Sequence, residues 1–431
     1  MTKLPAEGRN FRVVALLSLC AALAALTVGM QYFWQAWTLD IDVYWEAGER
    51  MRAGAGDLYL EPTDPQNGVG IFIYPPTFAV LFAPLTFLPR WLGYGLWGMV
   101  QLAAIAATLW FARRFLGVRH EGRVDFWLIV LLSVFGAAWE TIREGQVNFI
   151  VLSCMTGGLY CISRERSLQG GIWLALAAHL KIIPGVLLAV LIVQRRWRAA
   201  LGMLLGLALF YFSPLIWTIP VLGAGAGFER NQILTRQYYD EVAGPRLERQ
   251  QATSVGGPRA PNHAFSAVMQ RYFMNVGVSN LTVQRGPLLF EADNRFTRWG
   301  GFGIAGLLYL LALALAWRRR DSLSFSAACG LAFVAATLGN VLCWPHHLAA
   351  LALLVGPLAA LGLGQSSYLG RALLVTAAIV LFCHVTLLGP LEPFQIWGIP
   401  TLGVLVAWLV CFMTFWRREA PKAADATQAL T

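Results

Sequence analysis

Thirteen polar side chains fall in six short segments that long apolar runs separate. A carboxylate can take a proton from a hydroxyl, and fixed cations and hydrogen-bond donors stabilise an anion that gains charge as a bond breaks. Amides and phenols hydrogen-bond ligands that carry several hydroxyls. All of these types occur in the six segments: Asp40, Asp42, Tyr44, Tyr74, Arg143, Glu144, Gln146, Asn148, Lys181, Asn262, His263, His346 and His347.

Charge at the edge of apolar runs suggests an anionic ligand. Ionisable side chains at membrane depth cost about 2.5–3.5 kcal/mol at a helix centre, so Lys181 and Arg143 need a partner. A phosphate fits, and so does a neighbouring carboxylate such as Glu144. Structural alternatives stay open here: Asp40 or Asp42 as a solvated cap, and the imidazoles as interfacial groups.

Composition places these segments in a membrane protein. Of the 431 residues, 57% are hydrophobic and 13% are charged, whereas soluble domains average about 45–50% and about 25%. This excludes an ordinary cytosolic enzyme and a disordered protein. Lipid offers the backbone no hydrogen-bond partners, so the apolar runs must be helices. They lie at about 13–30, 92–111, 126–138, 147–161, 170–193, 199–221, 300–317, 325–342, 348–364, 372–388 and 397–416.

Arginine placement orients the runs. Basic clusters at 113–123, 195–198, 318–320 and 417–422 flank them, and cytoplasmic loops carry such an excess. The net charge of +10 therefore reflects membrane topology, and we expect no nucleic-acid partner. Run 13–30 follows basic residues and is longer than the apolar core of a signal peptide, so it predicts a first span with a cytoplasmic N-terminus.

Two apolar runs break this regularity. Residues 77–88 are short and rich in proline, so we expect them to lie on or dip into the outer face. Run 170–193 holds Lys181 and Pro184 and has basic clusters at both ends. It therefore predicts two short helices that meet at an outward tip near Lys181.

The sequence thus predicts an all-α polytopic protein of a bacterial cell membrane, with both termini cytoplasmic. One membrane domain over residues 1–431 has about twelve transmembrane helices, the broken pair included. Two large extracytoplasmic loops span about 34–90 and 222–297, and a cytoplasmic tail spans about 417–431. The six polar segments then meet on the extracytoplasmic face.

Several motifs occur in the order found in glycosyltransferase family 87. They are Asp40-Ile-Asp-Val-Tyr44 followed by Gly56-Asp-Leu-Tyr59, Tyr74-Pro-Pro-Thr-Phe78, Gly145-Gln-Val-Asn148, Lys181-Ile-Ile-Pro184, Asn262-His-Ala-Phe265 and Trp344-Pro-His-His347. Nearly the whole chain resembles this family. Two departures are His263 with Ala264, where a serine is common, and Thr77 after the Tyr-Pro-Pro segment.

The resemblance implies a GT-C membrane enzyme, similar to the mannosyltransferases of phosphatidylinositol mannoside synthesis. Such an enzyme moves a sugar from a polyprenyl-phosphate donor to a lipid or glycan acceptor and inverts the anomeric centre. The family register assigns the general base to Asp40 and not to Asp42. Two residues apart in an extended segment, these side chains would point to opposite faces.

The remaining site residues are expected to bind the substrates. Lys181, Arg143, His346 and His347 suit the phosphate that leaves, and Tyr44, Gln146, Asn148 and Asn262 suit sugar hydroxyls. Glu144 is a possible second carboxylate. A monophosphate needs little charge compensation, so we expect no metal and no other cofactor. The main alternative is a lipid or sugar transporter or flippase, which should show repeats or a polar path across the membrane; a structural membrane subunit is a third interpretation.

Overall fold

The computed structural model describes residues 40–54, 57–59, 71–119, 122–243, 262–274, 289–379, 395 and 397–418. Within these ranges the regular elements are helices. In chain order they are α2 (Asp40–Arg52), α3 (Pro76–Phe82), η2 (Ala83–Phe87), α4 (Arg90–Phe115), α5 (Arg123–Glu144), α6 (Asn148–Ser163), α7 (Ser167–Leu180), η3 (Ile183–Val186), α8 (Leu187–Val193), α9 (Trp197–Tyr211), α10 (Leu215–Leu222), α11 (Ala224–Gln237), η4 (Tyr238–Ala243), α13 (Phe265–Phe273), α14 (Asn294–Arg318), α15 (Ser322–Gly339), η5 (Pro345–Ala350), α16 (Leu351–Gly364), α17 (Ser366–Ile379) and α19 (Ile399–Arg417).

The protein is a multi-pass membrane protein. Seven helical stretches of the described residues are long and apolar enough to cross a bilayer: Arg90–Phe115, Val124–Glu144, Trp197–Leu222, Asn294–Arg318, Ser322–Gly339, Pro345–Gly364 and Ile399–Arg417. Four shorter apolar helices accompany them. The count of about twelve spans stays a prediction, because the shorter helices do not reach about 18 residues and the expected first span, 13–30, lies outside the described residues.

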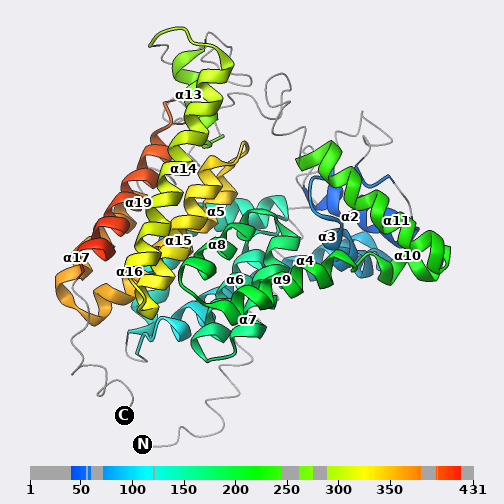
Figure 1. Cartoon of the computed structure of the whole chain (residues 1–431), viewed down its shortest axis with the longest axis horizontal. Coiled ribbons are helices and arrows are strands. Elements are labelled where there is room, and N and C mark those ends of the chain that lie inside the picture. Colours follow the sequence, from blue (N-terminus) through cyan, green and yellow to red (C-terminus); the bar gives the residue numbers. More distant parts are fainter. Residues whose placement is uncertain are drawn as a thin grey trace, which may run out of the picture.

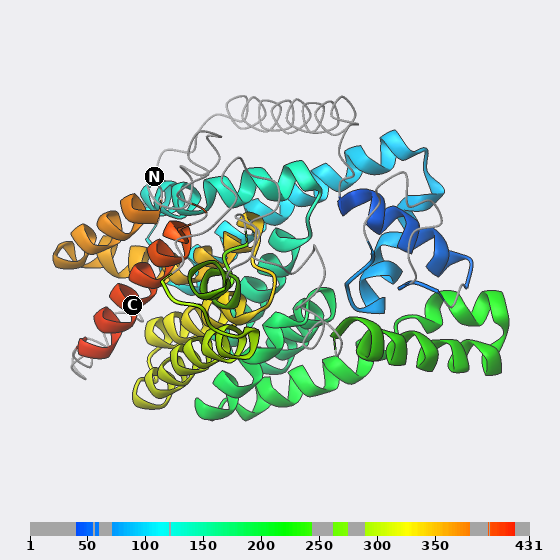
Figure 2. The ribbon, with the colours of Figure 1, turned by 90° about the horizontal axis from the view of Figure 1, so that it is seen from above.

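The helices form a bundle with a second helical group beside it. Figure 1 shows α14, α15, α16, α17 and α19 packed together at one side of the molecule, with α5 to α9 in the middle. At the other side, α2 and α3 lie next to α10 and α11, a neighbourhood that Figure 2 shows from above. The described parts of both predicted loops are therefore largely helical. The predicted C-terminal tail lies almost wholly outside the described residues.

The bundle has two chemically distinct ends. At one end, the Gln194 side chain donates to the carbonyls of Ala316 and Arg319, both at 2.5 Å. Arg418 pairs with Asp321 at 3.0 Å at the same end. We call this the basic end, because α4, α14 and α19 all end there in arginines. The turns between α5 and α6 and between α7 and η3 lie at the opposite end, which holds the candidate site.

The expected broken pair is present as α7 and α8. Lys181 is extended, with φ −155° and ψ 122°, and Pro184 lies in the first turn of the next short helix, η3. Proline fixes φ and lacks an amide hydrogen, so it starts a helix more readily than it continues one. Gly171 and Gly202 let α7 and α9 pack backbone to backbone, because a Cβ at either position would collide with a carbonyl of the other helix. The break therefore sits in a closely packed setting.

Candidate active site

A short turn between α5 and α6 organises the site. Gly145 ends α5 in the left-handed region, at φ 72°, where glycine pays no steric penalty. A Cβ on Gly145 would lie 2.8 Å from the Cβ of Ile41, so glycine also lets α2 approach this turn. The Trp97 indole donates to the Gly145 carbonyl at 2.6 Å. The turn thus presents Gln146 and Asn148 at fixed positions beside the start of α2.

Asp40 is the first residue of α2 and faces this turn. Its Oδ2 accepts a hydrogen bond from the Gln146 side-chain amide. Burial and the nearby charge of Glu144 raise the pKa of Asp40 to about 7, against the opposing charge of Lys181. Asp40 therefore changes protonation state near neutral pH, which is where a general base is effective.

Asp42 lies on the other side of the same helix. The Tyr94 hydroxyl donates to it, and Arg90 lies 3.8 Å away. The expectation of an extended segment here is wrong, because Asp40 and Asp42 stand in the first turn of a helix. Two residues along a helix turn about 200°, so the side chains still diverge. The structure does not bring Asp42 into the site around Asp40.

Lys181 approaches from the break in the α7–α8 pair. Its ammonium donates to Asn148 Oδ1 at 2.7 Å, and Asn148 Nδ2 is buried without a partner among the described residues. Burial lowers the pKa of Lys181 to about 7, while the Asp40 carboxylate acts in the opposite direction. Asp40 and Lys181 are thus electrostatic neighbours held by the same turn, one through Gln146 and the other through Asn148.

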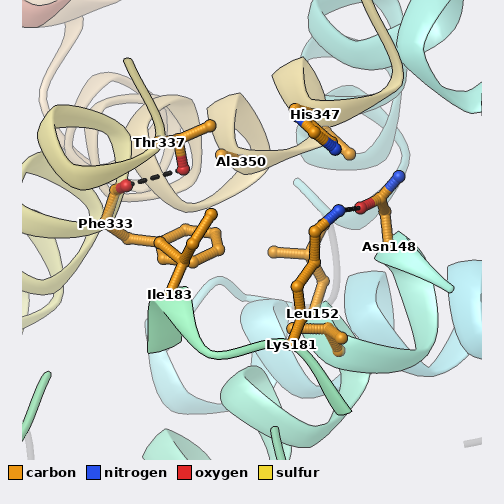
Figure 3. A pocket seen from close by; sticks show the side chains of 10 residues that line it. Asn148, Leu152, Lys181, Ile183, Phe333, Thr337, His347 and Ala350 are labelled. Atoms are coloured by element: carbon orange, nitrogen blue, oxygen red, sulfur yellow. Dashed lines mark hydrogen bonds between the residues drawn. The ribbon is translucent and has the colours of Figure 1, made fainter. Parts of the chain in front are cut away.

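A cavity that opens to solvent adjoins Lys181, and its empty space, the open mouth included, is about 290 Å³. Figure 3 shows the ammonium pointing at Asn148, with His347 across the opening and Ile183 and Phe333 beyond. Lys181, Asn148 and His347 occupy one end of the cavity. The rest of its wall is mostly apolar: Val151, Leu152, Ile183, Phe333, Thr337, Ala349 and Ala350.

The two histidines stand at the start of η5, close to Lys181. Their rings lie 4.5 Å apart at an interplanar angle of 87°. His347 Nδ1 is 3.0 Å from the Leu342 carbonyl, which fixes its ring. His346 is buried, and its Nε2 has no hydrogen-bond partner in the described part of the chain. A bound anion would give that nitrogen a partner.

Arg143 and Glu144 form an ion-pair cluster at the end of α5. Arg143 lies 2.7 Å from Glu140 and 2.6 Å from Glu144. The cation that we expected to meet a phosphate is therefore held by two carboxylates. Arg143 and Glu144 border the site, and each acts on it mainly through its charge.

Asn262 and His263 are buried beside the segment that leads to the histidines. Asn262 donates to the Val341 carbonyl at 3.0 Å and accepts from the Cys343 amide at 3.0 Å. Burial lowers the pKa of His263 to about 3, so this ring is neutral. Asn262 thus fastens the long loop to the segment before η5, and its amide is not free for a sugar.

Tyr44 and Tyr74 meet at the other side of Gln146. The Tyr74 hydroxyl donates to Gln146 Oε1 at 2.9 Å, and the two phenol oxygens are 2.9 Å apart. Gly145 and Trp97, which shape this corner, were not among the site residues singled out from the sequence. Trp97 carried no signal, since it lies within a long apolar run, whereas the Gly-Gln-x-Asn spacing marked the position of the turn.

Comparison with known proteins identifies the family. The model of glycosyltransferase family 87 matches residues 72–345, more than half of the chain. The chain belongs to this family. The matched range includes the α5–α6 turn, Lys181 and the segment that begins at Asn262. It ends at Pro345, immediately before the two histidines.

Two curated relatives of this family 87 member are polyprenol-phosphate-mannose-dependent alpha-(1-2)-phosphatidylinositol pentamannoside mannosyltransferases. The one from Mycolicibacterium smegmatis is 27% identical over 261 residues, which cover 56% of this chain and 55% of the relative. The one from Mycobacterium tuberculosis is 28% identical over 133 residues, or 30% of each chain. The chain thus matches at most about half the length of these relatives.

Two solved structures are also similar. ArnT from Cupriavidus metallidurans bound to undecaprenyl phosphate gives a TM-score of 0.45 at 16% identity, covering 93% of this chain and 76% of ArnT. The apo state of ArnT gives 0.39 at 14% identity, covering 94% and 77%.

Proposed function

We propose that this protein transfers a sugar from a polyprenyl-phosphate donor to a lipid or glycan acceptor, with Asp40 as the general base. One observation carries the proposal: the α5–α6 turn holds a carboxylate and an ammonium side by side through Gln146 and Asn148. One group suits the acceptor hydroxyl, and the other suits the phosphate. Membership of family 87 and the mannosyltransferase relatives support the reaction class, with mannose as the first sugar to test.

The phosphate would bind at the polar end of the cavity. Lys181 supplies the charge, and Asn148 Nδ2 and His346 Nε2 are buried donors or acceptors without a partner among the described residues. Buried polar atoms that lack a partner cost free energy, so a ligand that satisfies them gains affinity. The apolar wall beyond Lys181 suits the first prenyl units of the lipid.

The chemistry follows as a single displacement. The acceptor oxygen attacks the anomeric carbon, its proton passes to Asp40, and the bond to the phosphate oxygen breaks. Lys181 stabilises the phosphate as its charge grows. Glu144, the other carboxylate nearby, is paired with Arg143 at 2.6 Å. A single free carboxylate favours inversion over a covalent sugar intermediate.

We place the site on the extracytoplasmic face, with both chain termini in the cytoplasm. The basic end of the bundle carries the arginine clusters, which the positive-inside rule assigns to the cytoplasm. The site lies at the opposite end. A donor on a long prenyl chain would therefore meet the enzyme at the outer leaflet.

A transfer assay tests this function. The purified protein is given a panel of short-chain polyprenyl-phosphate sugars and a membrane-lipid and glycan extract as acceptor, with Asp40→Asn in parallel. Transfer from one donor that the variant loses is the expected result and identifies the sugar. A folded protein that transfers from no donor, yet moves the lipid across vesicle membranes, would favour a flippase instead.

A further inference from the structure

The side chain of Gln146 links Asp40 to a pair of phenols. Its Nε2 donates to Asp40 Oδ2, while its Oε1 lies 2.9 Å from the Tyr74 hydroxyl and 3.2 Å from that of Tyr44. The two phenol oxygens are 2.9 Å apart. Tyr74 donates to Oε1, and the single proton of Tyr44 goes either to the Tyr74 oxygen or to Oε1, so Oε1 accepts in both cases. This chain of donors fixes which way the amide faces.

The link is buried and has little freedom to move. Gln146, Tyr44 and Tyr74 are 3%, 1% and 6% exposed. The Tyr44 ring packs edge-on against Tyr74 and Phe78, with centroids 5.2 and 4.6 Å away. Close packing on both sides holds the phenols, and the phenols hold the amide. The Gln146 side chain therefore reaches Asp40 in one orientation.

We propose that Gln146 is a positioning residue for Asp40, and that Tyr44 and Tyr74 set the orientation of its amide. This inference rests on the proposed role of Asp40 as the base. With Oδ2 engaged by Gln146, Oδ1 is the oxygen that receives the acceptor's proton. The three residues thus act on the carboxylate, and they are not contacts to sugar hydroxyls as their types alone suggest.

The hydrogen bond has an electrostatic consequence that can be measured. A donor to a carboxylate favours its ionised form, so removal of the donor raises the pKa of that carboxyl. A hydrogen bond to a charged group is worth about one to two pKa units. In Gln146→Met, ionisation of Asp40 should therefore shift upward by about one to two pH units.

Two readouts of this shift use the full-length protein. In infrared titration, the carboxyl band of Asp40 is assigned by its loss in Asp40→Asn, and its midpoint is compared between the parent and Gln146→Met. In the transfer assay, the acidic limb of kcat should move upward by the same amount, with a loss of about five- to fiftyfold at pH 7 that a higher pH partly restores. Tyr44→Phe combined with Tyr74→Phe should give a smaller shift.

Tyr94→Phe is the matched control. It removes a phenol that donates to a carboxylate of the same helix, but the carboxylate is Asp42. This variant should leave both readouts as in the parent. An unchanged Asp40 midpoint in Gln146→Met, or a loss of activity that is confined to KM, would overturn the inference. The infrared shift does not depend on turnover, so its presence without transfer would reject the proposed function alone.

Discussion

At the scale of single residues, the decisive feature is that two carboxylates of one turn have different surroundings. Asp40 faces Gln146 and the charge of Lys181, while Asp42 is held by Tyr94 and Arg90. Their chemistry should differ accordingly, although they are the same residue type two positions apart.

Exchange of each aspartate for asparagine tests this difference. Asp40→Asn should lower transfer by about 10²–10⁴-fold, the usual contribution of a positioned base. Asp42→Asn should cost less than about fivefold, because asparagine keeps an oxygen that can accept from the Tyr94 hydroxyl and the pair with Arg90 is partly exposed. Steady-state rates provide the measurement, and thermal unfolding shows that both variants fold. Equal losses in the two variants would contradict the assignment of the base.

The dependence of activity on pH should follow from the same surroundings. Asp40, with a pKa raised to about 7, is active as a base only when ionised, so kcat/KM should fall below about pH 7. Lys181, with a pKa lowered to about 7, loses its charge above that value. The profile of the free enzyme should therefore be a narrow bell near neutral pH.

A bound phosphate should extend the pH range of activity on the alkaline side. Its negative charge favours the protonated amine, so the alkaline limb of kcat should lie at higher pH than that of kcat/KM. Rates from pH 5 to 9 at saturating and at low donor concentration provide both profiles. A Lys181→Met variant that keeps the same alkaline limb would show that another group is responsible.

At the scale of elements, the α5–α6 turn contacts both the proposed base, Asp40, and the proposed phosphate-binding cation, Lys181, which lie far apart in the sequence. Gly145 brings α2 close, Gln146 reaches Asp40, and Asn148 reaches Lys181. The turn thus sets the distance between base and cation. Both helices pack against others of the bundle, α5 against α16 and α6 against α4 and α7.

Gly145→Ala should disturb both groups at once. The new Cβ would lie 2.8 Å from Ile41 at a left-handed backbone position, which costs about 1–3 kcal/mol. We expect a lower unfolding temperature and a loss of transfer of about tenfold or more. Adding Ile41→Gly removes the Cβ that causes the collision but not the backbone strain, so it should restore activity more than stability. No recovery of activity would mean that the approach of α2 is unimportant.

The elements also show what could and could not be predicted from the sequence. Arginine placement and the Lys181–Pro184 pattern predicted helices with a break at Lys181, and the structure has that break. The helical conformation around Asp40 was not predicted, because a short polar stretch with β-branched residues has no clear period. The carboxylate partner of Arg143 was one of two alternatives that the sequence left open, and the structure has it in Glu140 and Glu144. The partners of Asn262 could not be predicted, since they depend on which distant segments pack together.

At the scale of the whole molecule, the separation of the basic end from the site end is the feature with the clearest consequence. If arginines orient the chain, the site faces outward and receives donors carried by the outer leaflet. Two exposed positions, one at each end of the bundle, can report which end faces outward. Glu291 lies before α14 at the site end, and Gln365 follows α16 at the basic end.

Cysteine labelling in cells should separate these two positions. In intact cells, a membrane-impermeant maleimide should modify Glu291→Cys, whereas it should reach Gln365→Cys only after permeabilisation. The parent chain is the control for its own cysteines, and those in the described residues are buried or half-buried. The opposite pattern would put Asp40 and Lys181 on the cytoplasmic side. That outcome would overturn the proposed topology and would require a donor in the inner leaflet. The roles proposed for Asp40 and Lys181 would stay the same, because their geometry does not depend on the orientation of the chain.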